Sequence, residues 1–202
     1  DWMVAAVSYF LGERGGVRMT GGGFGGCVVS LVPDDAIEPV KKIINDALRA
    51  IRFNNNRGYF FIYETNGLSV MHPILTQVQN PSLSDFTDIK GQYVVRNLSK
   101  IAKTQDEGFL RWWWKKPADT QTEYEKIGYS KYFQPFDWFI GTGDYVLDYE
   151  EELKQELLKK INLTPYSGDR YIFIIDDNGL MLSHANKSRI GKNQINLTDE
   201  TE

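Results

Sequence analysis

Lys126 and Tyr129 lie three positions apart, next to an aromatic-rich stretch of this 202-residue chain. A cationic side chain beside aromatic walls is what a carboxylate pocket needs, because a charge-assisted hydrogen bond holds the anion while apolar rings exclude water. Lys126 and Tyr129 can supply the polar contacts, and Trp114, Tyr63 and Phe61 can supply the wall. These residue types indicate a binding site for a small anion.

Strand geometry limits this prediction. Successive side chains of a strand point to opposite faces, so Tyr59, Phe61 and Tyr63 can share one face. Lys126 and Tyr129 differ by an odd number of positions. They therefore face one pocket only if their strand bends or ends between them.

Structural roles for the same residues stay open. Aromatic strand residues are ordinary packing elements, so Tyr59, Phe60 and Phe61 can belong to a sheet core. Lys126 has glutamates nearby in the sequence and can be a surface ion pair of little energetic weight. Among the tryptophans at 112–114, alternation places two rings on one face and the third on the other, so at least one is expected to be structural.

The chain offers few groups for catalysis or for binding a soft metal. It has two histidines, His72 and His184, and one cysteine, Cys27, and the central segment has no histidine beside a nucleophile. The pair Asp85 and Asp88 is more typical of a solvated loop than of a metal site. We therefore predict a protein that is not an enzyme and that binds no metal and no cofactor.

Composition limits the partners and the compartment. A hydrophobic content of 42% and a charged content of 25% are typical of a globular chain. The net charge of −4 provides no basic surface for nucleic acid, so we expect no nucleic-acid partner. No run approaches the roughly 18 apolar residues of a membrane span, so we expect membrane attachment only through flanking segments. A lone cysteine predicts no disulfide framework.

Residues 58–72 repeat at 170–184, with a constant offset of 112 (170 − 58) and seven identical positions. Each copy is an apolar run, an Asn-Gly turn and a second apolar run that ends at a histidine, which is typical of a β-hairpin. An offset of this length is about one domain. The repeat therefore predicts a duplicated domain whose second copy, at 168–202, is incomplete.

The remaining pattern predicts the fold class. Apolar residues at three- and four-residue spacing indicate a helix over 36–51, and further helices are expected at 93–103 and 145–161. Strands are expected at 108–114, 124–133 and 138–142. The order favours an α+β fold with a PAS-like central antiparallel sheet flanked by helices, and with an extra helix-loop-strand piece at the N-terminus.

Short motifs, ordered along residues 43–150, occur at 58–63, 66–67, 72–73, 88–91, 107–109, 114, 116–117, 126–131, 138–143 and 145. In this order they resemble the type-2 group of Cache sensor domains. The resemblance implies the sensing domain of a chemoreceptor, sensor kinase or cyclase, in the periplasmic or extracellular part of an inner-membrane protein. It also implies a small ligand, often a short carboxylate, and a possible homodimer of the full receptor. With its support, the predicted ligand-binding residues are Tyr63, His72, Trp114, Lys126 and Tyr129.

The first forty residues carry another pattern. The glycine-rich segment 15–26, followed by an apolar run to Pro33, resembles the C-terminal motif of galactokinase, where glycines let backbone N–H groups approach a phosphate. The predicted domains are a galactokinase-like fragment at 1–40, a Cache-like domain at 41–161 and the incomplete module at 162–202. We expect the glycine-rich N-terminus to pack weakly or irregularly against the Cache-like domain. A sugar-kinase fragment, or a fusion that retains phosphate or sugar affinity, is the alternative function.

Overall fold

The computed structural model describes residues 2–20, 27–75, 82–164 and 170–195. Its contacts divide the chain into two compact units, Asp1–Tyr145 and Val146–Glu202. Helix α4 (Val146–Leu163) was expected within the Cache-like domain 41–161 but belongs to the second unit. The reason is that strand β9 (Met181–Ser183) packs on this helix, where Ser183 Oγ donates a hydrogen bond to Asn162 Oδ1 at 2.7 Å.

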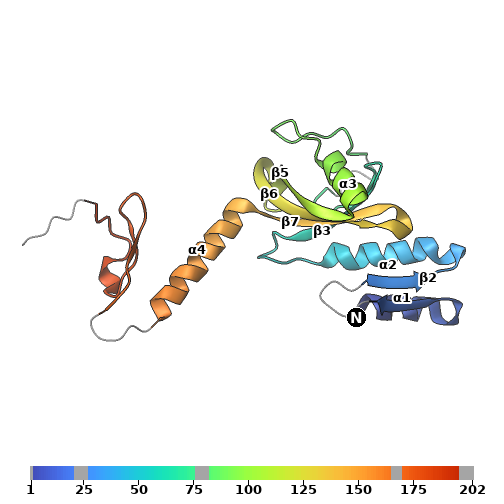
Figure 1. Cartoon of the computed structure of the whole chain (residues 1–202), viewed down its shortest axis with the longest axis horizontal. Coiled ribbons are helices and arrows are strands. Elements are labelled where there is room, and N and C mark those ends of the chain that lie inside the picture. The colour runs from blue at the N-terminus through green and yellow to red at the C-terminus, as the bar shows by residue number, and fades with distance from the viewer. Residues whose placement is uncertain (1, 21–26, 76–81, 165–169, 196–202) are drawn as a thin grey trace, which may run out of the picture. The chain divides into compact units, whose positions relative to one another are not determined.

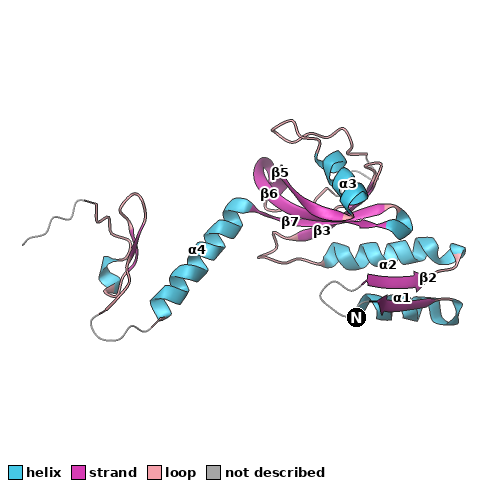
Figure 2. Cartoon of the chain, viewed as in Figure 1, coloured by secondary structure: helices cyan, strands magenta, loops and turns pink. Residues whose placement is uncertain are grey.

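A five-stranded antiparallel sheet forms the centre of the first unit (Figures 1 and 2). Its spatial order is β4-β3-β7-β6-β5. The sheet matches the predicted α+β architecture, and the three later strands extend the segments that the sequence indicated. The strands are β3 (Tyr59–Glu64), β4 (Ser69–Met71), β5 (Glu107–Lys116), β6 (Asp119–Phe133) and β7 (Trp138–Tyr145).

Helix α2 (Ile37–Ala50) covers one face of the sheet. Its buried residues Val40, Ile44 and Leu48 follow the predicted helical spacing. They form one core cluster with Ile62 and Trp138 of the sheet. Apart from Trp138 and the aromatic residues next to it, the side chains on this face are aliphatic, and they pack α2 on the sheet.

Helix α3 (Val94–Gln105) covers the opposite face. Its buried residues include Val94, Val95 and Leu98. They pack against the inward side chains of β3, β5 and β7, which are almost all aromatic. The aromatic residues predicted to share one face of β3 do share it. This cluster contains Tyr59, Phe61, Tyr63, Trp112, Trp114 and Phe139.

The N-terminal piece packs more closely than the sequence indicated. Helix α1 (Trp2–Leu11) is followed by the antiparallel pair β1 (Gly16–Thr20) and β2 (Cys27–Leu31), so two strands form where one was expected. Val7 and Leu11 are 3% and 2% exposed and lie in the same cluster as α2. The expectation of weak packing is therefore wrong for these residues, because apolar side chains of α1 cover α2. Part of the glycine-rich segment, 21–26, lies outside the described residues.

The second unit contains α4 and a hairpin of β8 (Ile174–Ile175) and β9. The pairs are Ile174↔Ser183 and Ile175↔Met181, with a register shift between Ile174 and Ile175. Each pair lies 112 residues after its counterpart in the β3–β4 hairpin, where the same shift occurs. The predicted repeat is therefore a repeat of backbone structure.

Candidate ligand-binding site

A small cavity lies between the inner face of the sheet and α3. The cavity has a volume of about 10 Å³, which is room for about one water molecule. A ligand with several heavy atoms therefore needs these side chains to move apart. The lining residues are Tyr59, Phe61, Tyr63, His72, Val94, Val95, Leu98, Trp112 and Trp114.

Lys126 lies in the middle of β6 and is 0% exposed. Its Nζ is 3.8 Å from the ring centroid of Tyr59, 4.9 Å from that of Tyr145 and 5.9 Å from that of Trp112. Tyr59 and Trp112 line the cavity, so the amine of Lys126 lies directly behind the residues that line it. Among the described residues Nζ has no hydrogen-bond partner. A buried donor without a partner is costly, which makes this atom the best candidate to contact a ligand.

Burial also changes the chemistry of this amine. It lowers the pKa of Lys126 to about 7, since an ammonium loses its hydration inside the protein, while the negative charge of Asp144 acts in the opposite direction. The alternative of a surface ion pair is excluded by the 0% exposure. The lysine therefore changes between cation and neutral amine near neutral pH.

Two glycines on neighbouring strands make room for this arrangement. A Cβ on Gly128 would come within 2.3 Å of the Trp112 ring, and one on Gly143 within 3.1 Å of Lys126 Cε. Gly128 and Gly143 face each other in the β6–β7 register. Because neither carries a side chain, the lysine stem and the indole can lie flat over the sheet.

His72 follows β4 and is 5% exposed. Its Nδ1 accepts hydrogen bonds from the backbone N–H groups of Ile74 and Leu75, at 3.3 and 3.2 Å. Burial, and then the charges of Lys126 and Arg49, lower the pKa of His72 to about 3. A neutral ring whose Nδ1 accepts carries its proton on Nε2. His72 therefore gives the cavity a fixed, uncharged N–H donor.

Two tyrosines of β3 add hydroxyl groups. Tyr59 and Tyr63 are 0% and 2% exposed. The side chain of Tyr145 lies next to the first hydroxyl and that of Ser69 next to the second, but among the described residues neither hydroxyl makes a hydrogen bond of standard geometry. Burial raises the pKa of both, so both remain protonated donors. The ring of Tyr63 stacks on Phe139 at a centroid distance of 5.6 Å. The site thus combines hydroxyl, imidazole and amine donors with apolar rings.

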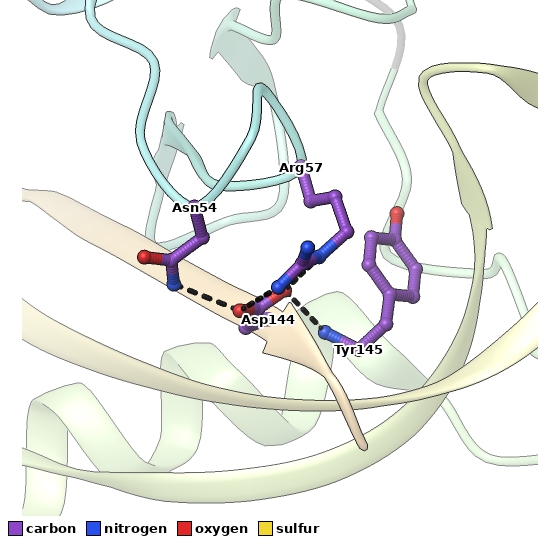
Figure 3. A network of polar contacts seen from close by, with 4 residues as sticks. All are labelled: Asn54, Arg57, Asp144 and Tyr145. Carbon is purple, nitrogen blue, oxygen red and sulfur yellow. Dashed lines mark hydrogen bonds and ion pairs between the residues drawn. The ribbon is translucent and has the colours of Figure 1, made fainter. Parts of the chain in front are cut away.

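A polar network holds the end of β7 beside the site (Figure 3). Arg57 and Asp144 form an ion pair at 3.1 Å, and Asn54 Nδ2 donates to Asp144 Oδ2 at 2.8 Å. The backbone N–H of Tyr145 donates to Asp144 Oδ1 at 2.8 Å. Burial raises the pKa of Asp144, but these hydrogen bonds outweigh it and keep the pKa below its ordinary value. The carboxylate is therefore negative and fixed.

Tyr129 is the predicted site residue that faces away from the cavity. Tyr63, His72 and Trp114 line the cavity, and Lys126 lies directly behind the lining residues. Strand β6 continues through this position to Phe133, so Tyr129 and Lys126 lie on opposite faces. The Tyr129 ring packs on Phe109 at 5.0 Å, and a hydrogen bond to Glu107 raises its pKa. The geometry removes Tyr129 from the candidate site, because the strand neither bends nor ends where the prediction required it.

The other predicted residues gather at one place. His72 lies 6.3 Å from Tyr63 and 5.8 Å from Trp114, measured between ring centroids. Tyr59 and Trp112 also line the cavity, although neither was among the predicted ligand-binding residues. The even spacing of Trp112 and Trp114 was the signal that both rings face inward.

Asp88 is buried rather than solvated. It is 5% exposed, and its Oδ1 accepts from the backbone N–H groups of Lys90 and Gln92 at 2.9 and 3.0 Å. Its Oδ2 accepts from Trp113 N at 3.0 Å. Asp88 therefore fixes the loop before α3 against β5. In the described ranges no group of three His, Cys, Asp or Glu residues is placed to hold a metal ion.

Comparison with known proteins decides the family. The family model described as "Cache domain" matches residues 35–202. The chain belongs to the Cache domain family. The methyl-accepting chemotaxis protein McpP of Pseudomonas putida is 31% identical over 110 residues, which are 54% of this chain and 20% of McpP. The chain therefore spans a fifth of this relative.

Solved structures of sensor domains resemble about half of this chain. A periplasmic sensor domain of a chemotaxis protein has a TM-score of 0.52 and 28% identity, over 54% of this chain and 74% of that one. A Cache chemosensory domain, solved in work on carboxylic acid recognition, has a TM-score of 0.52 and 26% identity over 54% and 73%. This Cache chain is thus homologous to the ligand-binding domains of chemoreceptors. These sensor domains are not enzymes.

The N-terminal resemblance is also found. Residues 2–50 match the C-terminal model of the GHMP kinases. The galactokinase of Haemophilus influenzae is 54% identical over 46 residues, which are 23% of this chain and 12% of that enzyme. The two family matches overlap at 35–50, a stretch that contains α2.

A helix that crosses a bilayer must be both long and apolar. Within the described parts of the chain, no helix has both the length and the apolar character needed to cross a bilayer.

Proposed function

We propose that this chain is the periplasmic or extracellular sensing region of a membrane receptor and that it binds a short carboxylate beside α3. The observation that carries the proposal is Lys126, an amine with 0% exposure and no hydrogen-bond partner among the described residues. An anion that reaches it gains a charge-assisted hydrogen bond in a region without competing water. The Cache structure associated with carboxylic acid recognition supports the same ligand class.

The remaining donors support an anion as well. His72 offers Nε2–H, Tyr59 and Tyr63 offer hydroxyls, and a carboxylate can accept from several donors at once. The tail of the ligand would lie against Trp112 and Trp114. Because the cavity has room for about one water molecule, we expect binding to separate α3 from the sheet slightly and to favour acids with few carbons.

An ammonium group on the ligand should prevent binding. None of the described residues that line the cavity is acidic, and Asp88 already accepts three backbone hydrogen bonds. An α-ammonium would therefore lose its hydration near Lys126 without gaining a counter-charge. We expect propionate to bind at least tenfold more tightly than alanine.

Titration calorimetry with acetate, propionate and butyrate tests the proposal. Lys126→Met keeps the side-chain stem and removes the charge, so it should weaken binding by about ten- to a hundredfold. The matched control is Lys131→Met on the same strand, because Lys131 is partly exposed and pairs with Glu107. Equal affinity in Lys126→Met and the parent, or equal losses in both variants, would overturn the site.

The kinase-like residues receive no separate function. They correspond to 12% of the galactokinase, and the described residues of α1 pack as a layer on α2. Phosphate or sugar affinity stays the alternative from sequence alone, and thermal-shift titration with galactose and ATP tests it directly.

A further inference from the structure

The surroundings of Lys126 determine when it is charged. Helix α3 presents apolar side chains to the cavity, and β5 presents indole rings. The charged or titratable groups around the amine, taken from every element packed there, are Tyr59 and Tyr63 of β3, His72 after β4, Lys116 of β5, Tyr124 of β6, Asp144 and Tyr145 of β7, Arg49 of α2, and Arg52 and Arg57 between α2 and β3.

Most of these groups keep one charge state around neutral pH. Tyr59 stays protonated because burial raises its pKa, and His72 stays neutral because burial lowers its pKa to about 3. Asp144 stays ionised because Arg57, Asn54 and the Tyr145 N–H donate to it. Lys126 is therefore the group in this enclosure whose charge can follow the ligand.

We propose that binding of an anion at this site is coupled to uptake of one proton by Lys126, and that Asp144 is a positioning residue that sets the pH range of the coupling. The inference rests on the proposed function, since it concerns the same site. A carboxylate, a proton and the neutral amine combine to an ammonium–carboxylate pair. No bond to carbon forms or breaks.

The direction of the effect follows from linkage. A bound anion favours the ammonium form, so the pKa of Lys126 rises above its free value of about 7 when the ligand is present. Well below that value the lysine is already charged and binding takes up no proton. Between that value and the raised pKa of the complex, binding takes up nearly one proton, and the affinity falls by up to about tenfold per pH unit. Short carboxylic acids lose their own proton near pH 4–5, so the ligand contributes nothing in this range.

Asp144 acts through the sheet. Asp144 precedes Tyr145, whose ring centroid is 4.9 Å from Lys126 Nζ. The Asp144 side chain lies on the opposite face of the sheet, where it forms an ion pair with Arg57 (Figure 3). Its negative charge raises the pKa of Lys126. Arg57 pairs with Asp144 at 3.1 Å, and by Coulomb's law a positive charge at that place offsets part of the effect of the carboxylate. Neutralising Asp144 should therefore move the coupling to lower pH, and removing the charge of Arg57 should move it to higher pH.

Calorimetric titration with propionate at pH 5.5, 7 and 8.5, each in two buffers of different ionisation enthalpy, measures the protons taken up. The expected uptake rises from near zero to near one. Lys126→Met should show no uptake at any pH where it still binds. Binding of the parent without uptake at pH 8.5, or with the same affinity at all three pH values, would overturn this inference and leave the proposed function intact. Absence of binding at every pH would overturn both.

Asp144→Asn and Arg57→Gln test the positioning role. We expect the pH midpoint of uptake to move down by about half a unit or more in Asp144→Asn and up in Arg57→Gln. Loss of a merely structural clamp would weaken binding in both variants without moving the midpoints in opposite directions. If Asp144→Asn does not fold, the upward shift in Arg57→Gln still decides the question.

Discussion

The two hairpins of this chain have related sequences and different surroundings. In β3–β4 and in β8–β9 the paired residues correspond at an offset of 112, including the register shift. In each, the histidine after the second strand accepts a backbone hydrogen bond on Nδ1, from Ile74 at 3.3 Å and from Asn186 at 2.8 Å. Local sequence therefore determines strand register and histidine orientation.

The aromatic neighbours of the histidines also correspond. His72 lies 5.3 Å from Tyr59 and 6.1 Å from Phe61. His184 lies 4.9 Å from Tyr171 and 6.4 Å from Phe173. The arrangement of a histidine beside a tyrosine and a phenylalanine thus occurs in both hairpins.

The two hairpins differ in how far their aromatic residues are buried. Tyr59 and Phe61 are 0% and 3% exposed, whereas Tyr171 and Phe173 are 51% and 54% exposed. Helix α3 and strands β5 to β7 cover the first hairpin. The hairpin thus provides the aromatic residues on one side of the site. The elements packed on it bury these residues, and the burial shifts the pKa values of the site and closes the cavity.

The largest expected difference between the copies comes from their phenylalanines. Phe61→Ala should lower the free energy of unfolding by about 3–5 kcal/mol, because it empties a packed core. Phe173→Ala should cost below about 1 kcal/mol, since half of that ring is already in water. Urea unfolding followed by tryptophan fluorescence reports on the first unit, which holds all five tryptophans. Amide exchange reports on β8–β9, and equal losses in both hairpins would contradict the comparison.

Acid should destabilise the enclosed copy through its histidine. The pKa of His72 is about 3 in the folded chain and 6.5 for the unperturbed side chain, so between these values the unfolded chain binds one more proton. Stability is therefore lost as the pH falls through this window, by about 2–4 kcal/mol. His72→Gln should flatten the slope, measured by urea unfolding from pH 4 to pH 7. His184→Gln lies in the other unit and should leave the tryptophan-detected slope unchanged.

Lys126→Met should stabilise the first unit. A buried amine gives up its hydration, and an apolar side chain of similar length does not, so we expect a gain of about 1–3 kcal/mol at pH 7. In the parent the pKa of Lys126 is about 7 in the folded chain and 10.5 for the unperturbed side chain, so the free energy of unfolding rises with pH between these values. The variant should lose this rise. A less stable variant at pH 7 would show that the lysine holds the core together.

The smallest effect should be shared by both copies. Gly67 and Gly179 occupy the hairpin turns with φ of +94° and +82°. An alanine Cβ would meet Ser84 at 2.8 Å in one turn and Ile195 at 2.7 Å in the other. Gly67→Ala and Gly179→Ala should therefore each cost about 1–2 kcal/mol. Amide exchange of each hairpin measures this, and a cost in only one copy would show that burial controls the turn as well.

Sequence predicted what depends on local pattern. The helix over 36–51 and the shared face of Tyr59, Phe61 and Tyr63 follow from periodicity, and both are found. The burial of Lys126 depends on strands that meet only after folding, and on Gly128 and Gly143, which leave it space. The position of Tyr129 depended on whether β6 bends, and the strand continues.

Helix α2 has a consequence for how such a chain can be assembled. Both family matches include it, and it contacts α1 on one side and the sheet on the other through aliphatic residues such as Val40 and Ile44. Aliphatic contacts have no directional requirement, so a helix of this kind accepts different neighbours. The packing of α1 on α2 therefore depends on apolar shape and not on matched polar groups. The face beneath α3 adds directional groups, because His72, Tyr59 and Tyr63 each present a donor there.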